Sequence, residues 1–136
     1  MLIMSYEDKK IFVIDDLNTL RETIVSHLRE EGFGRIYQAI DGQDALKKLE
    51  ELYGRDEKID LIFSDINMPN MNGIELLKEL KSDERFVDIP VVMLSSENEK
   101  EIVMEAVMSG ASNYILKPFT KMTLRSKLGE IDKLLA

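Results

Sequence analysis

The stretch Ile62–Gly73, IFSDINMPNMNG, joins a buried element to a turn and places a carboxylate at the junction. A short apolar run ends on Asp65, and an Asn-rich segment that contains one Pro and ends on Gly follows it. Short apolar runs bounded by charges or by Gly and Pro are typical of strands buried on both faces, which occur in parallel sheets. Asp65 therefore either caps and solvates the end of a strand or is held at a site.

The same pattern recurs along the chain and predicts a sheet of the α/β class. Amphipathic stretches, in which apolar residues repeat every three or four positions, separate the apolar runs and predict helices between strands. The predicted strands are Ile11–Ile14, Leu61–Phe63, Val91–Leu94 and Tyr114–Leu116, with a weaker edge strand at Arg35–Ile40. This alternation predicts a doubly wound, five-stranded parallel sheet with five helices distributed over both faces.

Five apolar stripes locate the predicted helices and their buried faces. Gly32, Gly54 and Gly110 follow three of these stripes, and Gly after a periodic segment is a helix-stop signal. At 136 residues the chain is expected to form a single domain, residues 1–136, without a linker. The stripes are Leu20, Ile24, Val25 and Leu28; Ala45, Leu46, Leu49 and Leu52; Ile74, Leu77 and Leu80; Ile102, Val103, Ala106 and Val107; and Leu124, Leu128, Ile131 and Leu135.

The composition narrows the classes of function. The formal net charge is −8, with 26 acidic against 18 basic residues, whereas nucleic acids and anionic membranes are bound through clustered Lys and Arg. We therefore expect neither a nucleic-acid nor a membrane partner. The chain has no Cys, which excludes disulfides and thiolate metal sites. The N-terminus lacks the basic start and long apolar core of a signal peptide, so we expect a cytoplasmic protein.

Polar residues follow the predicted strands at the edge where ligands bind in this class of fold. In an open parallel sheet, ligands lie outside the carboxyl ends of the strands. Taken singly, each polar residue at that edge is better explained as a helix cap or a solvated side chain. The residues concerned are Asp15 and Asp16 after one strand, Asp65 after a second, Ser95 and Ser96 after a third, and Lys117 after the last.

Taken together, three carboxylates and one ammonium at the same edge are not explained by capping. Two like charges about 4 Å apart repel by roughly 4 kcal/mol at the effective dielectric of a protein surface, so a third carboxylate requires a cation. Mg²⁺ binds carboxylate oxygens and keeps exchangeable waters that a phosphate can replace. The placement of these residues therefore predicts a Mg²⁺ site that accepts an anion, without specifying the reaction.

Four sequence features in register carry a resemblance to a known family. From Ile11 to Leu134 the chain resembles the receiver domain of two-component response regulators, which has a flavodoxin-like fold. Ser95 lies 30 residues and Lys117 lies 52 residues after Asp65, as in that family. Within it, the stretches NMPNMNG and GASNYILKPFT and the pattern at Thr123–Leu128 are similar to the stand-alone chemotaxis regulators. The four features are Asp15–Asp16, the stretch D-I-N-M-P-N-M-N-G from Asp65 to Gly73, the hydroxyl of Ser95, and K-P-F at Lys117–Phe119.

The resemblance implies a role for each residue of the acidic edge. Asp65 is the implied nucleophile, which takes a phosphoryl group from a histidine kinase. Pro69 and Gly73 are expected to shape a loop that leaves Asp65 exposed. Asp16, Asp65 and the backbone carbonyl of Asn67 are implied to ligate Mg²⁺, with Asp15 acting through water. Phosphorylation and dephosphorylation are then self-catalysed, and the protein is not a dedicated enzyme.

Lys117 and Ser95 are the implied partners of the phosphoryl group, one as a point charge and the other as a hydrogen-bond donor. The resemblance also implies a cis peptide bond between Lys117 and Pro118. Two polar residues, Asn67 and Glu97, lie two places beyond Asp65 and Ser95 and are implied to tune dephosphorylation.

The implied switch pairs Ser95 with Tyr114. If Ser95 moves toward the phosphoryl group, Tyr114 gains room to rotate inward, and the signal is read on the fourth helix, the last strand and the last helix. Candidates for partial exposure on that surface are Val103, Val107, Tyr114 and Met122. Core packing is nevertheless favoured for most members of the group formed by Val107 and the Met residues.

The resemblance also implies partners, while alternatives stay open. The implied partners of the monomer are a histidine kinase and a downstream target such as a flagellar motor switch protein, with a phosphatase as a further candidate. One alternative is a Mg²⁺-dependent phosphohydrolase with an Asp nucleophile, but the second acid and the cap insertion expected of such an enzyme are missing from the sequence. Another is a receiver that serves only as an interaction module, which the intact acidic residues and Lys117 disfavour. The last is a receiver excised from a longer transcriptional regulator, although a chain that ends one residue past Leu135 favours a stand-alone protein.

His27 is expected at the surface, beside the apolar stripe of the first helix.

Overall fold

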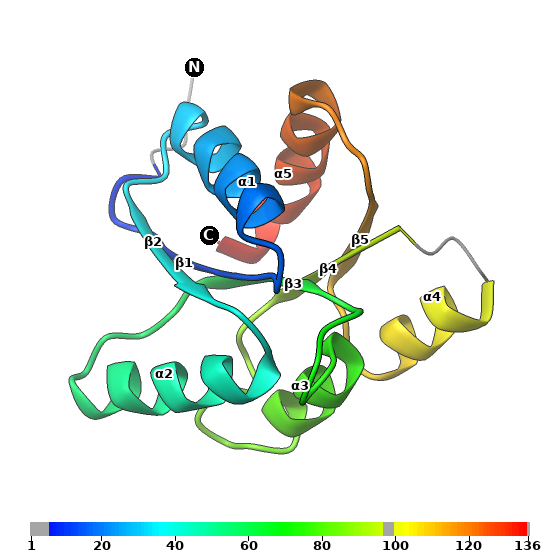
Figure 1. Cartoon of the computed structure of the whole chain (residues 1–136). Coiled ribbons are helices and arrows are strands. Elements are labelled where there is room, and N and C mark those ends of the chain that lie inside the picture. Colours follow the sequence, from blue (N-terminus) through cyan, green and yellow to red (C-terminus); the bar gives the residue numbers. More distant parts are fainter. Residues whose placement is uncertain (1–5, 97–99, 136) are drawn as a thin grey trace.

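A five-stranded parallel sheet with strand order β2-β1-β3-β4-β5 organises the chain (Figure 1). The structure is a computed structural model, and it describes residues 6–96 and 100–135. Its strands are β1 Lys10–Ile14, β2 Arg35–Ala39, β3 Leu61–Asp65, β4 Val91–Ser95 and β5 Asn113–Leu116, and its helices are α1 Asn18–Glu30, α2 Gly42–Gly54, α3 Gly73–Lys81, α4 Lys100–Met108 and α5 Lys121–Leu135. The predicted doubly wound α/β fold is confirmed.

Two helical layers enclose the sheet, with α1 and α5 on one face and α2, α3 and α4 on the other (Figure 1). Successive side chains of β1 serve the two layers alternately. Phe12 and Ile14 pack toward α2 and α3, whereas Ile11 and Val13 pack toward α1 and α5. All four are fully buried, which explains why this strand is a continuous apolar run in the sequence.

Strands β3 and β4 extend further at their carboxyl ends than the apolar runs in the sequence predict. Asp65 is the last residue of β3 and Ser95 is the last residue of β4. Asp65 pairs with Leu94 in the register of the two strands. Both polar residues are therefore held by the hydrogen-bond ladder of the sheet, and neither belongs to a loop.

The predicted helix faces are correct for α2 and α3 but partly wrong for α1 and α4. In α1 the buried residues are Ile24, Val25 and Leu28, whereas Leu20 is 40% exposed beside the site. In α4 only Ala106 is buried. Val107 is 58% exposed, which confirms the expected exposure of that residue and contradicts its packing in the core. The side chain of Leu135 lies outside the described side chains.

Among the described residues, two Met side chains are buried, Met71 is half-buried and three Met side chains are exposed. Met93 and Met68 are buried, in agreement with the expected core packing. On α4 and α5, in contrast, Met104 is 50%, Met108 is 83% and Met122 is 81% exposed. Core packing is therefore wrong for these three residues. A helix that exposes so many apolar side chains is not explained by packing within the described part of the chain.

The start of α3 lies directly against the backbone of Asp65. A Cβ atom on Gly73 would lie 2.1 Å from the carbonyl oxygen of Asp65 and 2.9 Å from the Cα of Ile66. The Gly73 N–H also donates to the Ile66 carbonyl at 2.8 Å. Asn72 caps the helix and forms a reciprocal capping box with Glu75. The Asn-Gly pair that ends the opening stretch therefore starts α3 close to the carboxylate.

None of the helices in the described parts of the chain combines the length and the apolarity needed to cross a bilayer.

Replacement of Gly73 by Ala is expected to lower the free energy of unfolding by about 3 kcal/mol, because the new methyl group would overlap backbone atoms that cannot rotate away. Chemical denaturation measures the loss. Gly129→Ala is the matched control, since a Cβ atom there meets nothing within 4 Å in the interior of α5, and it is expected to add about 0.5–1 kcal/mol. Equal stabilities for the two variants would contradict the close approach at Gly73.

Candidate functional site

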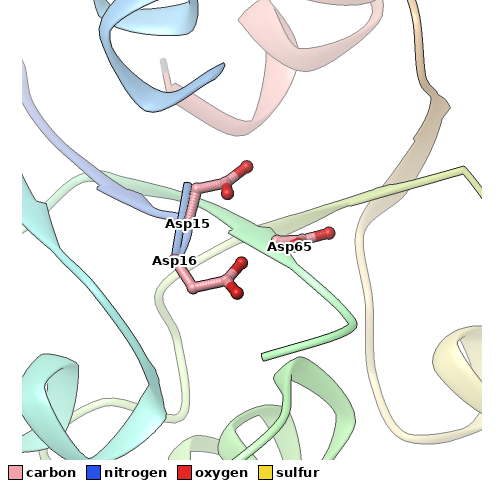
Figure 2. A group of neighbouring side chains, drawn as sticks. All are labelled: Asp15, Asp16 and Asp65. Atoms are coloured by element: carbon pink, nitrogen blue, oxygen red, sulfur yellow. The ribbon is translucent and has the colours of Figure 1, made fainter. Parts of the chain in front are cut away.

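Three carboxylates gather at the carboxyl ends of β1 and β3 (Figure 2). Asp15 and Asp16 directly follow β1, and Asp65 ends the neighbouring strand β3. One oxygen atom from each residue lies within 4.8 Å of the others. Asp15 is fully buried and Asp65 is only 7% exposed. Asp65 is therefore held inside the site, and the expectation of an exposed Asp65 is wrong.

Lys117 extends from the end of β5 into this cluster. Its Nζ atom lies 2.9 Å from Oδ2 of Asp15 and 3.1 Å from Oδ1 of Asp65. The Lys117 N–H donates to the Ser95 carbonyl at 2.8 Å, which anchors the residue beside β4. The peptide bond between Lys117 and Pro118 is cis, as predicted.

Backbone donors fix the two buried carboxylates. The N–H of Ile66 donates to Oδ1 of Asp65 at 2.9 Å, and the N–H of Leu17 donates to Oδ1 of Asp15 at 3.0 Å. Arg21 donates to the backbone carbonyl of Asp15 at 2.8 Å. The orientation of both carboxylates is thus set by the protein itself.

Burial and charge act on the site in opposite directions. Burial raises the pKa of Asp65. The Lys117 ammonium lowers this pKa, whereas the Asp15 carboxylate raises it, and the net result is a raised pKa. Burial alone lowers the pKa of Lys117, but hydrogen bonding and attraction from Asp15 and Asp65 outweigh it and raise that pKa. With Lys117 charged, three ionised carboxylates leave the cluster with an excess of two negative charges. One divalent cation balances this excess.

The other predicted residues occupy different positions around the cluster. Ser95 is fully buried at the end of β4. Asn67 is exposed, and it lines a cavity of about 470 Å³ together with Asp16, Asp65 and Lys117. Tyr114 is half-buried on β5 and packs against the core on the side of α2, α3 and α4. Glu97 lies outside the described residues.

Asp16 and His27 also line this cavity. From the sequence, Asp16 could be a helix cap, and His27 is expected at the surface. Asp16 does not cap α1, because the N-cap residue is Leu17 and no side chain accepts a hydrogen bond there. His27 is half-buried on α1, and its ring lies 6.4 Å from that of Phe119. The cavity continues from the carboxylates along α1 to these two rings. Sequence reasoning missed this extension, because it is formed by contact between α1 and the segment after β5.

Comparison with known proteins agrees with this geometry. The family model of the response regulator receiver domain matches residues 11–129. The chain is 38% identical over 125 residues to the chemotaxis protein CheY-3 of Vibrio cholerae, and the match covers 92% of each chain. It is 40% identical over 119 residues to the chemotaxis protein CheY1 of Helicobacter pylori, covering 88% of this chain and 93% of the relative.

A solved structure of similar shape contains a partner and ligands. In the CheX–CheY–BeF₃–Mg²⁺ complex of Borrelia burgdorferi, a chain that is 25% identical superposes with a TM-score of 0.82. The match covers 91% of this chain and 89% of that one. The chain described here belongs to the response regulator receiver domain family. It is a phosphoacceptor protein of signal transduction and not a dedicated enzyme.

Replacement of Asp65 by Asn is expected to raise the melting temperature of the Mg²⁺-free protein at pH 7, because the amide keeps the shape of the carboxyl without its buried charge. The folded pKa of Asp65 is raised, so the folded chain holds the proton more tightly than the unfolded chain does. The resulting stabilisation is complete below the unfolded pKa of about 3.9 and is lost as the pH rises through the folded value.

The advantage of Asp65→Asn should therefore shrink as the pH falls toward about 4. Thermal denaturation in the presence of a chelator, from acid to neutral pH, measures this trend. Asp56→Asn serves as a control, because Asp56 is exposed and its left-handed backbone, with φ of 59°, also suits Asn. A lower melting temperature for Asp65→Asn at pH 7 would show that the ion pair with Lys117 outweighs burial.

Proposed function

We propose that the chain receives a phosphoryl group on Asp65, beside a bound Mg²⁺, in a two-component pathway of chemotaxis. The single observation that supports this proposal most strongly is the convergence of Asp15, Asp16 and Asp65 on one point, with Lys117 beside two of them. The Borrelia burgdorferi complex adds support, because it contains Mg²⁺ together with BeF₃, a fluoride that imitates a phosphoryl group on a carboxylate.

Asp16 and Asp65 are the proposed direct ligands of Mg²⁺, with the backbone carbonyl of Asn67 as a third ligand and Asp15 acting through water. Mg²⁺ binds hard oxygen ligands and retains exchangeable waters, so these protein oxygens would hold the ion without excluding an anion from the site. The donor set fits the ion, since it consists of hard oxygens that carry two more negative charges than Lys117 neutralises. When bound, Mg²⁺ offsets the charge on the phosphoryl oxygens.

The residues of the chain supply the other parts of the reaction. A carboxylate oxygen of Asp65 attacks the phosphorus atom of a phosphohistidine, a new O–P bond forms, and the N–P bond to the imidazole breaks. The pair of N–P electrons stays with the imidazole, which takes up a proton. Lys117 then exchanges its contact with the Asp65 carboxylate for one with a phosphoryl oxygen. In hydrolysis, water attacks the same phosphorus atom, the O–P bond to Asp65 breaks, inorganic phosphate leaves with the protons of the water, and Asp65 regains its free carboxylate. Asn67 and Glu97 are the proposed residues that tune the access of this water.

Phosphorylation changes the charge next to Ser95 and Lys117, and these two residues are the proposed transmitters. A phosphoryl group carries about −1.5 to −2 charges at neutral pH, which draws the Ser95 hydroxyl and the Lys117 ammonium toward it. Tyr114 precedes Lys117 by three residues on β5 and is half-buried. Movement of Ser95 would allow Tyr114 to turn inward and so change the surface formed by α4, β5 and α5.

The exposed side chains on α4, β5 and α5 support this surface as the one that binds a partner. Its apolar members are Met104, Val107, Met108, Leu116 and Met122, each at least 47% exposed. Apolar side chains gathered on an exposed face are typical of protein-binding sites. By analogy with the CheY relatives, the proposed partners are a histidine kinase and a flagellar motor switch protein. A phosphatase is a further partner, and the protein acts as a cytoplasmic monomer.

Incubation with Mg²⁺ and acetyl phosphate is expected to add one phosphoryl group, which intact-mass spectrometry detects. Asp65→Asn and chelation of Mg²⁺ should both abolish the addition, whereas Asp56→Asn should leave it unchanged, because Asp56 is exposed and outside the cluster. Retention of the phosphoryl group by Asp65→Asn would refute the proposed acceptor. Repeated turnover of phosphomonoesters would instead favour the hydrolase alternative.

Replacement of Lys117 by Ala is expected to leave Asp65 modifiable but to uncouple the modification from the output surface. Loss of the ammonium increases the negative charge of the cluster, so Mg²⁺ should bind at least as tightly, while the phosphoryl group loses its partner on β5. Amide chemical shifts of Tyr114 and α4, recorded before and after phosphorylation, measure the coupling. Arg55→Ala removes an exposed ion pair with Glu57, outside α4, β5 and α5, and is the control. Normal shifts in phosphorylated Lys117→Ala would exclude Lys117 as transmitter.

A further inference from the structure

The loop between β3 and α3, residues 66–72, carries Asn67 past the acidic cluster. Backbone hydrogen bonds hold its two ends. The Ile66 N–H donates to the Leu94 carbonyl at 3.1 Å, and the Gly73 N–H donates to the Ile66 carbonyl at 2.8 Å. These bonds fix where the loop leaves the sheet and where it enters α3. They do not fix the path of the residues between.

The middle of the loop is tied to a different element, the start of α2. Nδ2 of Asn70 donates to Oδ2 of Asp41 at 2.8 Å, and the Gly42 N–H donates to the Met71 carbonyl at 3.1 Å. Asp41 and Asn70 are 29 positions apart in the sequence. In Figure 1 the first turn of α2 lies next to the segment that leads from β3 to α3.

Asp41 uses both carboxylate oxygens and is almost completely buried. While Oδ2 accepts from Asn70, Oδ1 accepts from the Asp44 N–H at 2.8 Å and so caps α2. The side chain is 5% exposed. The hydrogen bonds from the Asp44 backbone and from Asn70 both lower the pKa of Asp41. The carboxylate therefore serves one partner within its own helix and one in the loop of the metal site.

The two segments are in close contact, with little freedom left between them. A Cβ atom on Gly42 would lie 2.7 Å from Cγ and 2.8 Å from the carbonyl oxygen of Met71. Asn70 has a φ of 65°, in the left-handed region where Asn is among the few tolerated residues. The docking on α2 and the conformation of Asn70 thus constrain the path of the loop, together with the buried Met68 and the Met71 N–H, which donates to the Pro69 carbonyl at 2.7 Å.

We propose that Asp41 is a positioning residue for the Mg²⁺ and phosphoryl site, because its bond to Asn70 fixes the loop that carries Asn67, which lines the same cavity as Asp16 and Asp65. The inference rests on the proposed function, which assigns that carbonyl to Mg²⁺. Asp41 itself touches neither the ion nor the phosphoryl group. Residues that orient metal ligands through hydrogen bonds commonly alter metal affinity by an order of magnitude or more when replaced.

Two single variants remove the hydrogen bond between Asp41 and Asn70, one by changing the acceptor and the other by changing the donor. Each keeps the other structural role of the residue that it replaces. Asp41→Ser keeps a hydroxyl that caps α2 but is too short to reach Asn70. Asn70→Gly removes the donor and keeps a residue that tolerates a positive φ. Each is expected to raise the dissociation constant of Mg²⁺ three- to tenfold in titration calorimetry, at a temperature where thermal melts show the chain folded. The double variant Asp41→Ser/Asn70→Gly should bind no more weakly than the weaker single variant.

An exchange of donor and acceptor provides the rescue. In Asp41→Asn/Asn70→Asp, the new amide at position 41 donates to the new carboxylate at position 70, and its oxygen still accepts from the Asp44 N–H. The net charge equals that of the unmodified chain, so Mg²⁺ affinity should return to within twofold. Asn70→Asp alone brings two carboxylates together and should displace the loop, which amide shifts of Asn67 and Met68 report. Asn70→Gly alters no charge, so a change in Mg²⁺ affinity in this variant comes from loss of the hydrogen bond and not from a change in electrostatics.

The outcomes distinguish this inference from the function on which it rests. If the unmodified chain takes up no Mg²⁺, the proposed function fails and the inference fails with it. If the unmodified chain binds Mg²⁺ and both single variants bind it equally well, only the inference is overturned, even where their melting temperatures fall. A loss confined to Asp41→Ser would also overturn it, because the effect would then come from the charge or the cap and not from the loop.

Discussion

Repulsion among three carboxylates at one edge of the sheet is the constraint on which the rest of the site depends. The strand order places β1 beside β3, so Asp15 and Asp65 leave adjacent strands in the same direction. Neither residue can move apart from the other without disturbing a ladder that is buried on both faces. The chain tolerates the arrangement because Lys117 reaches across from β5 to both carboxylates. A divalent cation completes the balance and at the same time prepares the edge for an anion.

Helix α4 is attached to the sheet less firmly than the other helices, so it is the helix that a change of charge at the site displaces most easily. On one side, α5 is linked to α1 by the pairs Lys121–Glu30 at 2.7 Å and Arg125–Glu31 at 2.8 Å. On the other side, α4 buries only Ala106 among its residues. Elements with few buried apolar contacts are the ones that rearrange at low cost. This chain therefore combines a sheet that is buried on both faces and holds Asp65 with one weakly packed helix, α4, beside it.

Much of the fold and of the site could be predicted because the relevant signals are local. Strands buried on both faces leave uninterrupted apolar runs, and the residues that follow such runs meet at one edge of a parallel sheet. Asp15, Asp16, Asp65 and Lys117 were therefore found from their positions alone. Leu20 and Val107 were assigned to the wrong face, because periodicity marks an apolar stripe but does not tell whether another element covers it. The burial of Asp65 and the bond between Asp41 and Asn70 depend on contacts between distant segments, which no local pattern contains.

The docking of the 66–72 loop on α2 also limits how this segment can change in length. Surface loops generally tolerate insertions and deletions, since most of their residues contact only solvent. This loop is held at Ile66, at Asn70 and at Gly73, so one added or missing residue would shift the register between these three anchors. Variation among related chains should therefore appear here as exchange of side chains, whereas gaps in an alignment should fall in the turns at the opposite edge of the sheet.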